Sequence, residues 1–463
     1  MKRIAIIGGG ISGLAALHFI RTRYGDACLP VLYEKETRLG GTIGTDVVDG
    51  FISDWGPNGF LDRVPLTLQM VRELGAEHLL EPSHSASGKR FIYRRGRLHE
   101  ITPSPVAFMR SPLLSIRGRL RLAAEPFIKG RRNWDEDESI FDFATRRIGR
   151  EAALTLIDPM VSGIFGGNAA RLSLQSCFPI MRDMEMEYGS LVKALIARKR
   201  KAHKTGHGNS VGPAGPAGRL TSFKNGLYTL IRVFGEKYAA DVRSGRPIGG
   251  ITRTQGRYYL DGADDDNEGY DAIICAAPAY AASTMTRSLD VQLSEILAAI
   301  PYASIAVVCL GYRREEVGHD LNGFGFIIPR TESRRILGTI WTSSIFAGSA
   351  PEGTIQVRTM VGGATDPEAA GLADETLVDL VAAELKPILE IRGLPVYVRI
   401  FKYQQGIPQF TLGHAGRMKT LADILTAFPG LYFTGNAYDG VGLNDCVLRS
   451  DKAVSQTAAY LEL

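Results

Sequence analysis

A glycine turn near the start of the chain constrains the fold more than any other feature. The apolar run KRIAII at residues 2–7 is followed by Gly8-x-Gly10-x-x-Gly13 and then by apolar residues at helical spacing. This order predicts a buried parallel strand, a tight turn and a helix. In such a unit Gly8 forms the turn, Gly10 lets a pyrophosphate lie against bare backbone, and Gly13 lets the helix pack closely on the strand. We therefore expect an α/β, Rossmann-like dinucleotide-binding fold.

The helix after the turn and the strand after that helix complete the unit. Ile11 and Ser12 open the helix, so their N–H groups and the positive end of the helix dipole would face the phosphates. The next apolar run, VLYE, ends at Glu34, twenty-one residues after Gly13. A carboxylate at this position can accept hydrogen bonds from both ribose hydroxyls. We expect Glu34, with Lys35 beside it, to contact the adenosine half of the cofactor.

Two further glycine-rich turns bear on whether the dinucleotide is NAD or FAD. The segment ETRLGGTIGT places Arg38, Gly40, Gly41 and Thr42 shortly after Glu34, where a second close approach of backbone to cofactor is expected. The segment DWGPNGF adds a rigid turn of the kind whose N–H groups can face a flat polar ring. The residues expected at this ring are Gly56, Pro57, Asn58 and Gly59.

Together, these motifs resemble the flavin-dependent amine oxidase superfamily and, within it, the porphyrinogen oxidases, meaning the protoporphyrinogen oxidases and their coproporphyrinogen-oxidising relatives. The resemblance covers essentially the whole chain and rests on GGGISGLAA, RLGGTI, KRFIYRRGRLHEI, DPMVSGIFGGNAARLS, GFGFIIP, GIPQFTLGH and GNAYDGVGLNDC. Thr42 stands where amine oxidases typically place Arg. The resemblance implies one non-covalent FAD per chain, with adenine bracketed by backbone groups at Ile248.

The closing loop GNAYDGVGLNDC, residues 435–446, need not be a second nucleotide site. FAD is an extended molecule, and the first glycine turn reaches only its pyrophosphate and adenosine half. We expect the closing loop to meet the ribityl and flavin half, and Asp445 to cap a helix whose positive end stabilises negative charge on the reduced flavin. The expected contacts are Gly435, Asn436, Val441, Gly442 and Leu443.

The resemblance also implies where a substrate binds. Arg90, which precedes the aromatic residue of KRFIY, would pair with a substrate carboxylate. Phe324, Gly325, Ile327 and Phe346 would form the walls that hold a macrocycle against the flavin. The residues alone leave two alternatives open, namely a solvated arginine among the basic residues of 89–97 and ordinary core positions on strands.

The reaction implied by the resemblance is the removal of six hydrogens from protoporphyrinogen IX in three hydride transfers to flavin, with dioxygen reduced to peroxide, in haem biosynthesis. Coproporphyrinogen III is the alternative substrate. Further alternatives are another enzyme of the superfamily, such as a carotene desaturase, and a non-catalytic porphyrin-binding flavoprotein. Because the cofactor performs the difficult step, we assign no catalytic side chain and no metal. Helix capping for Asp158 and a structural role for His414 are more economical than catalysis.

The pattern of elements divides the chain into three parts. A discontinuous FAD-binding domain is expected from residues 1–85, 218–290 and 415–463. Residues 86–217 show helical periodicity and are predicted to form a mainly helical insertion that ends in a flexible, Gly- and Pro-rich loop at 205–218. Residues 291–414 alternate strands with one helix and are predicted to form an α+β substrate domain, in which ILGTIWTSSIF is one strand.

Composition limits the partners and the compartment. A net charge of +5 over 463 residues is too weak an excess to imply nucleic acid binding. The five cysteines lack the spacing of metal or redox motifs, which fits a reducing compartment. No run of about eighteen apolar residues occurs, so we expect a cytoplasmic protein. Residues 111–132 mix apolar residues with Arg, which fits either a helix on an anionic membrane surface or a helix that covers its own domain. A homodimer is left open.

Overall fold

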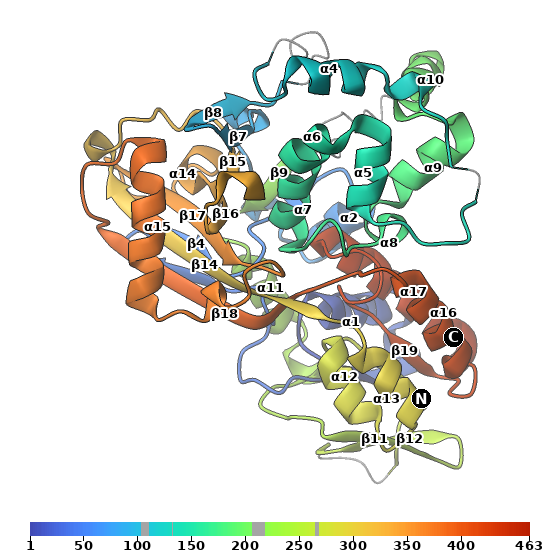
Figure 1. Ribbon diagram of the computed structural model, residues 1–463. Coiled ribbons are helices and arrows are strands. Elements are labelled where there is room, and N and C mark those ends of the chain that lie inside the picture. The colour runs from blue at the N-terminus through green and yellow to red at the C-terminus, as the bar shows by residue number, and fades with distance from the viewer. Residues whose placement is uncertain (103–110, 132, 206–217, 264–267) are drawn as a thin grey trace.

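The computed structural model describes residues 1–463 apart from 103–110, 132, 206–217 and 264–267. Figure 1 shows three parts: a layer of helices at the upper right, a sheet with one long helix at the left, and a parallel sheet with its helices below. The loop predicted at 205–218 lies almost wholly outside the described residues.

The lower part is built on a five-stranded parallel sheet whose strands come from distant parts of the chain. The order is β10-β2-β1-β13-β19. The strands are β1 Lys2–Ile7, β2 Cys28–Tyr33, β10 Val242–Arg243, β13 Ala272–Cys275 and β19 Leu431–Phe433. Parallel pairing needs crossover connections, so segments far apart in sequence become neighbours. The predicted α/β fold with a discontinuous Rossmann-like unit is confirmed.

Helices cover both faces of this sheet because alternate residues of β1 point to opposite sides. Ile4 and Ile6 join one core, and Ala5 and Ile7 join another. The first face carries α1 Ile11–Tyr24, α11 Tyr228–Lys237 and α17 Leu443–Leu461. The second carries α12 Ala279–Thr286, α13 Val291–Ala298, α16 His414–Leu425 and the hairpin of β11 Gly250–Thr254 and β12 Arg257–Asp261. Helix α13, which the sequence assigned to the substrate domain, therefore packs against this sheet.

The second sheet has seven strands in the order β18-β14-β17-β16-β15-β7-β8. They are β7 Phe91–Arg94, β8 Arg97–Glu100, β14 Tyr302–Arg313, β15 Gly325–Ile327, β16 Ile336–Ile340, β17 Thr354–Gly362 and β18 Tyr397–Pro408. Helix α15, Asp374–Leu389, covers one face, where its Leu377 and Val381 pack with Val308 and Leu310 of β14. On the opposite face, Val307 and Cys309 of β14 pack with Phe51 and Tyr397.

Two segments of this sheet differ from the sequence-based assignment. The β7–β8 hairpin lies in the stretch assigned to the helical insertion, yet Phe91 pairs in parallel with Phe326 of β15. The segment ILGTIWTSSIF is not one strand, because β16 ends at Ile340 and α14, Thr342–Ile345, follows. The N–H groups of Ser344 and Ile345 turn back to the Trp341 carbonyl oxygen, and this local bonding takes the chain out of the sheet.

Short elements connect the two sheets. They are β3 Thr45–Val48, β4 Phe51–Asp54, β5 Phe60–Leu61, α2 Pro65–Glu73, β6 Leu80–Pro82 and β9 Leu220–Phe223. β3 pairs with β4, and β9 pairs with both β5 and β6. The turn between β4 and β5 contains the predicted cofactor residues 56–59.

The helical layer contains seven α-helices in its described part. They are α4 Ile116–Ala123, α5 Ile140–Ile148, α6 Arg150–Ala152, α7 Asp158–Phe165, α8 Leu174–Cys177, α9 Pro179–Tyr188 and α10 Leu191–Thr205. The stretch 111–132 contains only the short α4 and a 3-10 turn at Glu125–Phe127, because Pro126 disfavours continuation of the helix before it. Among the described residues, no helix has the length and apolar content needed to cross a membrane.

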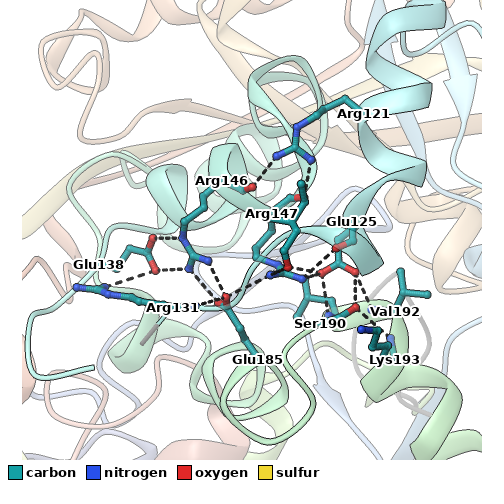
Figure 2. Close-up of polar contacts among 12 residues, drawn as sticks. Arg121, Glu125, Arg131, Glu138, Arg146, Arg147, Glu185, Ser190, Val192 and Lys193 are labelled. Carbon is teal, nitrogen blue, oxygen red and sulfur yellow. Dashed lines mark hydrogen bonds and ion pairs between the residues drawn. The ribbon is translucent and has the colours of Figure 1, made fainter. Parts of the chain in front are cut away.

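A buried ion-pair network holds the helical layer together (Figure 2). Arg147 of α5 is fully buried and donates to the carboxylates of Glu125 and Glu185. Glu125 also accepts from the Ser190 hydroxyl at 2.6 Å and from the Leu191 N–H at 2.9 Å. Every charge in this group has hydrogen-bond partners, which offsets the cost of removing it from water. The network therefore links α5, α9, α10 and the turn after α4.

Candidate cofactor and substrate site

The glycine turn between β1 and α1 has the geometry of a phosphate cradle. Gly8 has a φ of +108°, which side chains rarely adopt. A Cβ on Gly13 would lie 1.9 Å from the Gly8 carbonyl oxygen, so only glycine allows the helix to pack this closely. A Cβ on Gly10, by contrast, would meet nothing within 4 Å. The bare backbone of Gly10 and the helix-terminal N–H groups of Ile11 and Ser12 therefore border space that a cofactor can fill.

Glu34 follows the last residue of β2 and lies directly beside this turn. It is 7% exposed, and its carboxylate accepts from the Gly9 N–H at 2.6 Å. The Glu34 carbonyl oxygen accepts from the Arg246 N–H at 2.8 Å, and Ile248 follows two residues later. Lys35 is exposed and forms an ion pair with the next glutamate at 3.2 Å. The structure thus brings Glu34 to the turn and leaves the Lys35 side chain in solvent.

Arg38 shapes the second glycine turn from within. Its guanidinium donates to the carbonyl oxygens of Leu39, Gly41 and Ile43 at 2.9, 2.6 and 2.7 Å. It also lies over the Trp55 ring, 4.4 Å from the centroid. These bonds use the donors of Arg38 inside the turn, so its role in this structure is to fix the backbone that approaches the cofactor.

The second glycine turn lies against the first. The Gly40 N–H donates to the Gly9 carbonyl oxygen at 2.8 Å, and a Cβ on Gly41 would lie 3.6 Å from the Gly10 Cα. Gly40 and Gly41 have φ values of +109° and +57°. The two turns form one continuous wall, which leads on to Thr42.

The turn at 56–59 extends this wall. A Cβ on Gly56 would lie 2.5 Å from the Thr42 carbonyl oxygen, so the two backbones are in direct contact. Asn58, between Pro57 and Gly59, has a buried Nδ2 with no hydrogen-bond partner among the described residues. A buried donor without an acceptor is costly, and this one remains available for a ligand.

The closing loop meets the first glycine turn. A Cβ on Gly435 would lie 3.9 Å from the Ser12 Oγ, and the Ser450 hydroxyl donates to the Ser12 carbonyl oxygen at 2.8 Å. Asn436 follows Gly435 and is half-buried, while Val441 packs against the helical layer. The two glycine-rich ends of the chain are therefore parts of one surface.

Helix α17 begins at this surface with a capping arrangement. Gly442 is its N-cap and Leu443 its first residue. Asp445 is the third residue, and its carboxylate accepts from the Gly442 N–H at 3.0 Å. Burial raises the pKa of the Asp445 carboxyl, although this hydrogen bond acts in the opposite direction. Asp445 thus caps the helix as expected, from inside its first turn.

Arg90 and Phe324 of the predicted substrate site are neighbours. The Arg90 guanidinium lies 5.3 Å from the centroid of the Phe324 ring. The Phe324 N–H donates to the Lys89 carbonyl oxygen at 2.8 Å, where β7 and β15 begin to run side by side. Arg90 is exposed as a residue, but partial burial of its guanidinium lowers the pKa of Arg90.

The remaining predicted wall residues lie on two different elements. Gly325 and Ile327 are in β15, where a Cβ on Gly325 would lie 2.0 Å from the Thr339 carbonyl oxygen. Ile327 lies against Gly163 of α7 and so faces the helical layer. Phe346 is 7% exposed and lies after α14, outside the strand in which the sequence placed it.

Sequence reasoning missed one buried cation, Arg358 in β17. It is 7% exposed, and its Nη2 donates to the carbonyl oxygen of Gly56 in the cofactor wall. The signal that could have revealed it was a charged residue inside the apolar strand TIQVRTMVGG. Alternation along that strand places Arg358 on the same side as Gln356, whose amide donates to Ser53 at 2.7 Å.

Asp158 and His414 have structural partners. The expected helix capping by Asp158 is wrong: Ile157 is the N-cap of α7, and the Asp158 carboxylate forms an ion pair with Arg330 at 2.5 Å instead. His414 is 2% exposed, stacks on Phe410 and donates from Nε2 to the Tyr438 carbonyl oxygen at 3.0 Å. Burial lowers the pKa of His414, although that hydrogen bond acts in the opposite direction. Both residues are explained without a catalytic role.

The parallel sheet, the phosphate cradle and the acidic residue beside it define a dinucleotide-binding protein. The sequence profile of the family described as flavin containing amine oxidoreductase matches residues 11–456, and the chain belongs to this family. It is an FAD-dependent oxidoreductase. This confirms the cofactor and the enzyme class that the sequence predicted.

Named relatives match the chain over its full length. Coproporphyrinogen III oxidase of Bacillus subtilis is 32% identical over 99% of this chain and 98% of that protein. Protoporphyrinogen oxidase of Bos taurus is 30% identical over 98% of each. A crystal structure from Exiguobacterium sp. 255-15, assigned as a protoporphyrinogen oxidase, superposes with a TM-score of 0.83 at 26% identity, covering 100% of this chain and 99% of that one. The resemblance to the porphyrinogen oxidases is thereby confirmed.

Proposed function

We propose that this protein oxidises a porphyrinogen to the corresponding porphyrin, with FAD as the electron acceptor and dioxygen as the final oxidant. The observation that carries the proposal is the full-length similarity, at 32% identity, to a relative named for this activity. The proximity of Arg90 to Phe324 supports it, since a cation beside an aromatic wall suits a flat macrocycle with carboxylate substituents.

The residues present fit FAD. Gly10 offers open space beside a helix N-terminus, and Asn58 has a buried donor without a partner in the described chain. The adenosine and pyrophosphate half would be held by Gly8, Gly10, Ile11, Ser12, Gly13, Glu34 and Ile248, and Lys35 would contribute only its backbone because its side chain is exposed and paired with Glu36. The ribityl and flavin half would be held by Gly40, Gly41, Thr42, Gly56, Pro57, Asn58, Gly59, Gly435, Asn436, Val441, Gly442 and Leu443, while Arg38 would act indirectly by fixing the turn from within.

The bound cofactor supplies hydride acceptance, and each of three such transfers would reduce one dioxygen to peroxide. The chain itself binds and orients. The backbone at Gly10 and Gly41 would hold the cofactor, and the N-terminus of α17 would favour negative charge on the reduced flavin. Arg90 would pair with a substrate carboxylate while Phe324 and Ile327 exclude water from the macrocycle.

Two substrates are candidates. Protoporphyrinogen IX is the first, and the Bos taurus relative, at 30% identity, carries the name protoporphyrinogen oxidase. Coproporphyrinogen III is the second, and a specific observation favours it: the relatives from Bacillus subtilis and Staphylococcus aureus, at 32% and 27% identity, carry that name. The two substrates differ in the number of carboxylates, so the contribution of Arg90 to binding would differ between them.

One experiment tests this function. The purified holoprotein is mixed anaerobically with protoporphyrinogen IX or coproporphyrinogen III, and the flavin absorbance is followed. Bleaching with either is the expected result, and the relative rates assign the substrate. If neither porphyrinogen bleaches the flavin, the proposal is wrong. Bleaching without turnover in air would leave a porphyrin-binding flavoprotein that uses another electron acceptor.

Peripheral contact with the cytoplasmic face of a membrane is a second part of the proposal. Ile116, Leu120 and Phe127 are 72%, 66% and 88% exposed, and the exposed Arg117 and Lys129 lie among them. Such a mixture suits an anionic lipid surface. Sedimentation with anionic vesicles tests this: loss at moderate salt indicates an electrostatic contact, persistence indicates apolar insertion, and no sedimentation contradicts the contact.

A further inference from the structure

Arg358 is a buried cation whose charge no ion pair neutralises within the described part of the chain. No carboxylate of those residues lies within ion-pair distance of its guanidinium, and its Nε is buried without a hydrogen-bond partner among them. Its cross-strand neighbours are Cys309 of β14 and Ile340 of β16, and neither is a carboxylate that could form an ion pair with it. A desolvated guanidinium in such surroundings is costly unless a ligand carrying negative charge shares the site.

The buried carboxylate of Asp54 does not meet this need. Asp54 already accepts hydrogen bonds from the Thr45 hydroxyl at 2.6 Å and from the Leu227 N–H at 2.9 Å. Burial raises the pKa of Asp54, and the charge of Arg358 acts in the opposite direction. Within the described part of the chain, Asp54 therefore feels the charge of Arg358 but forms neither an ion pair nor a hydrogen bond with it, and its carboxylate is bonded to Thr45 and Leu227 instead.

A chain of backbone contacts connects Arg358 to the phosphate cradle. Gly41 lies beside Gly10, the Thr42 carbonyl oxygen lies against Gly56, and the Gly56 carbonyl oxygen accepts from Arg358 Nη2. Arg358 thus stands at the end of the wall farthest from the adenosine half. The Nδ2 of Asn58, which no described residue bonds, belongs to the same turn. Two buried donors without a described acceptor, Arg358 Nε and Asn58 Nδ2, therefore belong to residues on or against the turn that is expected to face the flat end of the cofactor.

We propose that Arg358 is an electrostatic positioning residue for the flavin, whose buried guanidinium favours the reduced, more negatively charged state of the ring. The proposal rests on FAD binding along this wall and is independent of which porphyrinogen is oxidised. At an effective dielectric constant of about 20, one charge within about 10 Å changes the ratio of reduced to oxidised cofactor by about tenfold or more. For a two-electron couple, tenfold corresponds to about 30 mV.

The test is the midpoint potential of bound FAD, measured without substrate by equilibration with a redox dye of known potential. Arg358→Gln and Arg358→Met remove the charge with different shapes, and Arg358→Lys keeps it. The matched control is Arg399→Gln in β18. Arg399 also lies opposite Cys309, on the same face of the sheet, but it is paired with Asp46 at 3.4 Å and is 36% exposed.

The expected result is a lower potential in both neutral variants, a potential near that of the wild type in Arg358→Lys, and no change in Arg399→Gln. An unchanged potential in the neutral variants overturns the proposal. An unchanged potential with a raised KM for porphyrinogen also overturns it and assigns Arg358 to a substrate carboxylate. If one neutral variant does not fold, the other decides. A wild-type protein that binds FAD but oxidises neither porphyrinogen fails the proposed function and leaves this test intact.

Discussion

Arg330 and Asp158 form a bidentate ion pair that joins the helical layer to the seven-stranded sheet. Arg330 Nε donates to Asp158 Oδ2 at 2.7 Å, and Nη2 donates to Oδ1 at 2.5 Å. Asp158 begins α7 and is 1% exposed, whereas Arg330 follows β15 and is partly exposed. Since β15 also carries Gly325 and Ile327, this pair fixes the helical layer over the proposed substrate walls.

Loss of this pair is expected to destabilise the protein. Arg330→Gln should lower the free energy of unfolding by about 1–3 kcal/mol, because the buried Asp158 carboxylate would lose its charged partner. Urea unfolding measures the change. The control is Arg335→Gln, which breaks the more exposed pair with Asp366 at 2.9 Å and should cost no more than about 1 kcal/mol. Equal effects of the two substitutions would contradict a structural role for the Arg330 pair.

The first βαβ unit could be predicted from the sequence because each of its features is local. Gly8 and Gly13 are required by a backbone conformation and by a close approach, so their spacing is informative. Pairing between distant strands is not encoded locally. The parallel contact of Phe91 with Phe326 depends on the whole sheet, and for this reason β7 and β8 were assigned to the wrong layer.

The candidate site shows the same division. The need for glycine at Gly13, Gly40 and Gly56 has a local reason, because a Cβ at each would collide with a backbone carbonyl oxygen. Arg38 was expected to approach the cofactor, yet its guanidinium bonds the carbonyl oxygens of its own turn. Arg358 has no motif, and its burial arises only when β17 lies between β14 and β16 with the 56–59 turn against it.

His18 is predicted to make stability depend on pH near neutrality. It is fully buried in α1, with Nε2 bonded to the Glu73 carboxylate at 2.7 Å and Nδ1 bonded to the Tyr238 hydroxyl at 2.7 Å. Burial lowers its pKa below 6.5, although Glu73 opposes the shift. Between the folded pKa of His18 and 6.5, the unfolded chain therefore binds more protons than the folded chain. Stability should therefore fall as pH falls below 6.5 and continue to fall down to the folded pKa.

The check is the free energy of unfolding measured across this pH range for the wild type and for two variants. His18→Asn should flatten the dependence, because it removes the titrating ring. His78→Asn replaces an exposed histidine on the turn after α2 and should leave the profile unchanged. A profile that His18→Asn does not alter would show that another group titrates.

Gly10→Ala should separate cofactor binding from folding. Gly10 has φ −74°, and a Cβ there would meet open space, so alanine is compatible with the apoprotein. The methyl group would instead occupy space proposed for the pyrophosphate, and overpacking of about 1–3 kcal/mol corresponds to an increase of about 5- to 150-fold in the Kd for FAD. Gly416→Ala in α16 also meets open space and should leave FAD affinity unchanged, while it stabilises the helix by about 0.5–1 kcal/mol. Isothermal titration of apoprotein with FAD measures the affinity, and equal affinity of both variants would place the cofactor elsewhere.

Arg90→Ala should weaken substrate binding without loss of FAD. A charge-assisted hydrogen bond contributes about 1.5–3 kcal/mol, so KM for the porphyrinogen should rise about tenfold or more. Arg90→Lys keeps the charge but cannot form two parallel hydrogen bonds to a carboxylate. Its KM should lie between those of the wild type and Arg90→Ala. Arg97→Ala removes an exposed arginine of β8 and serves as the control. If Arg90→Ala and Arg97→Ala had the same kinetics, Arg90 would be a solvated residue of the hairpin. A larger rise in KM for coproporphyrinogen III than for protoporphyrinogen IX in Arg90→Ala would show that Arg90 contacts the additional carboxylates.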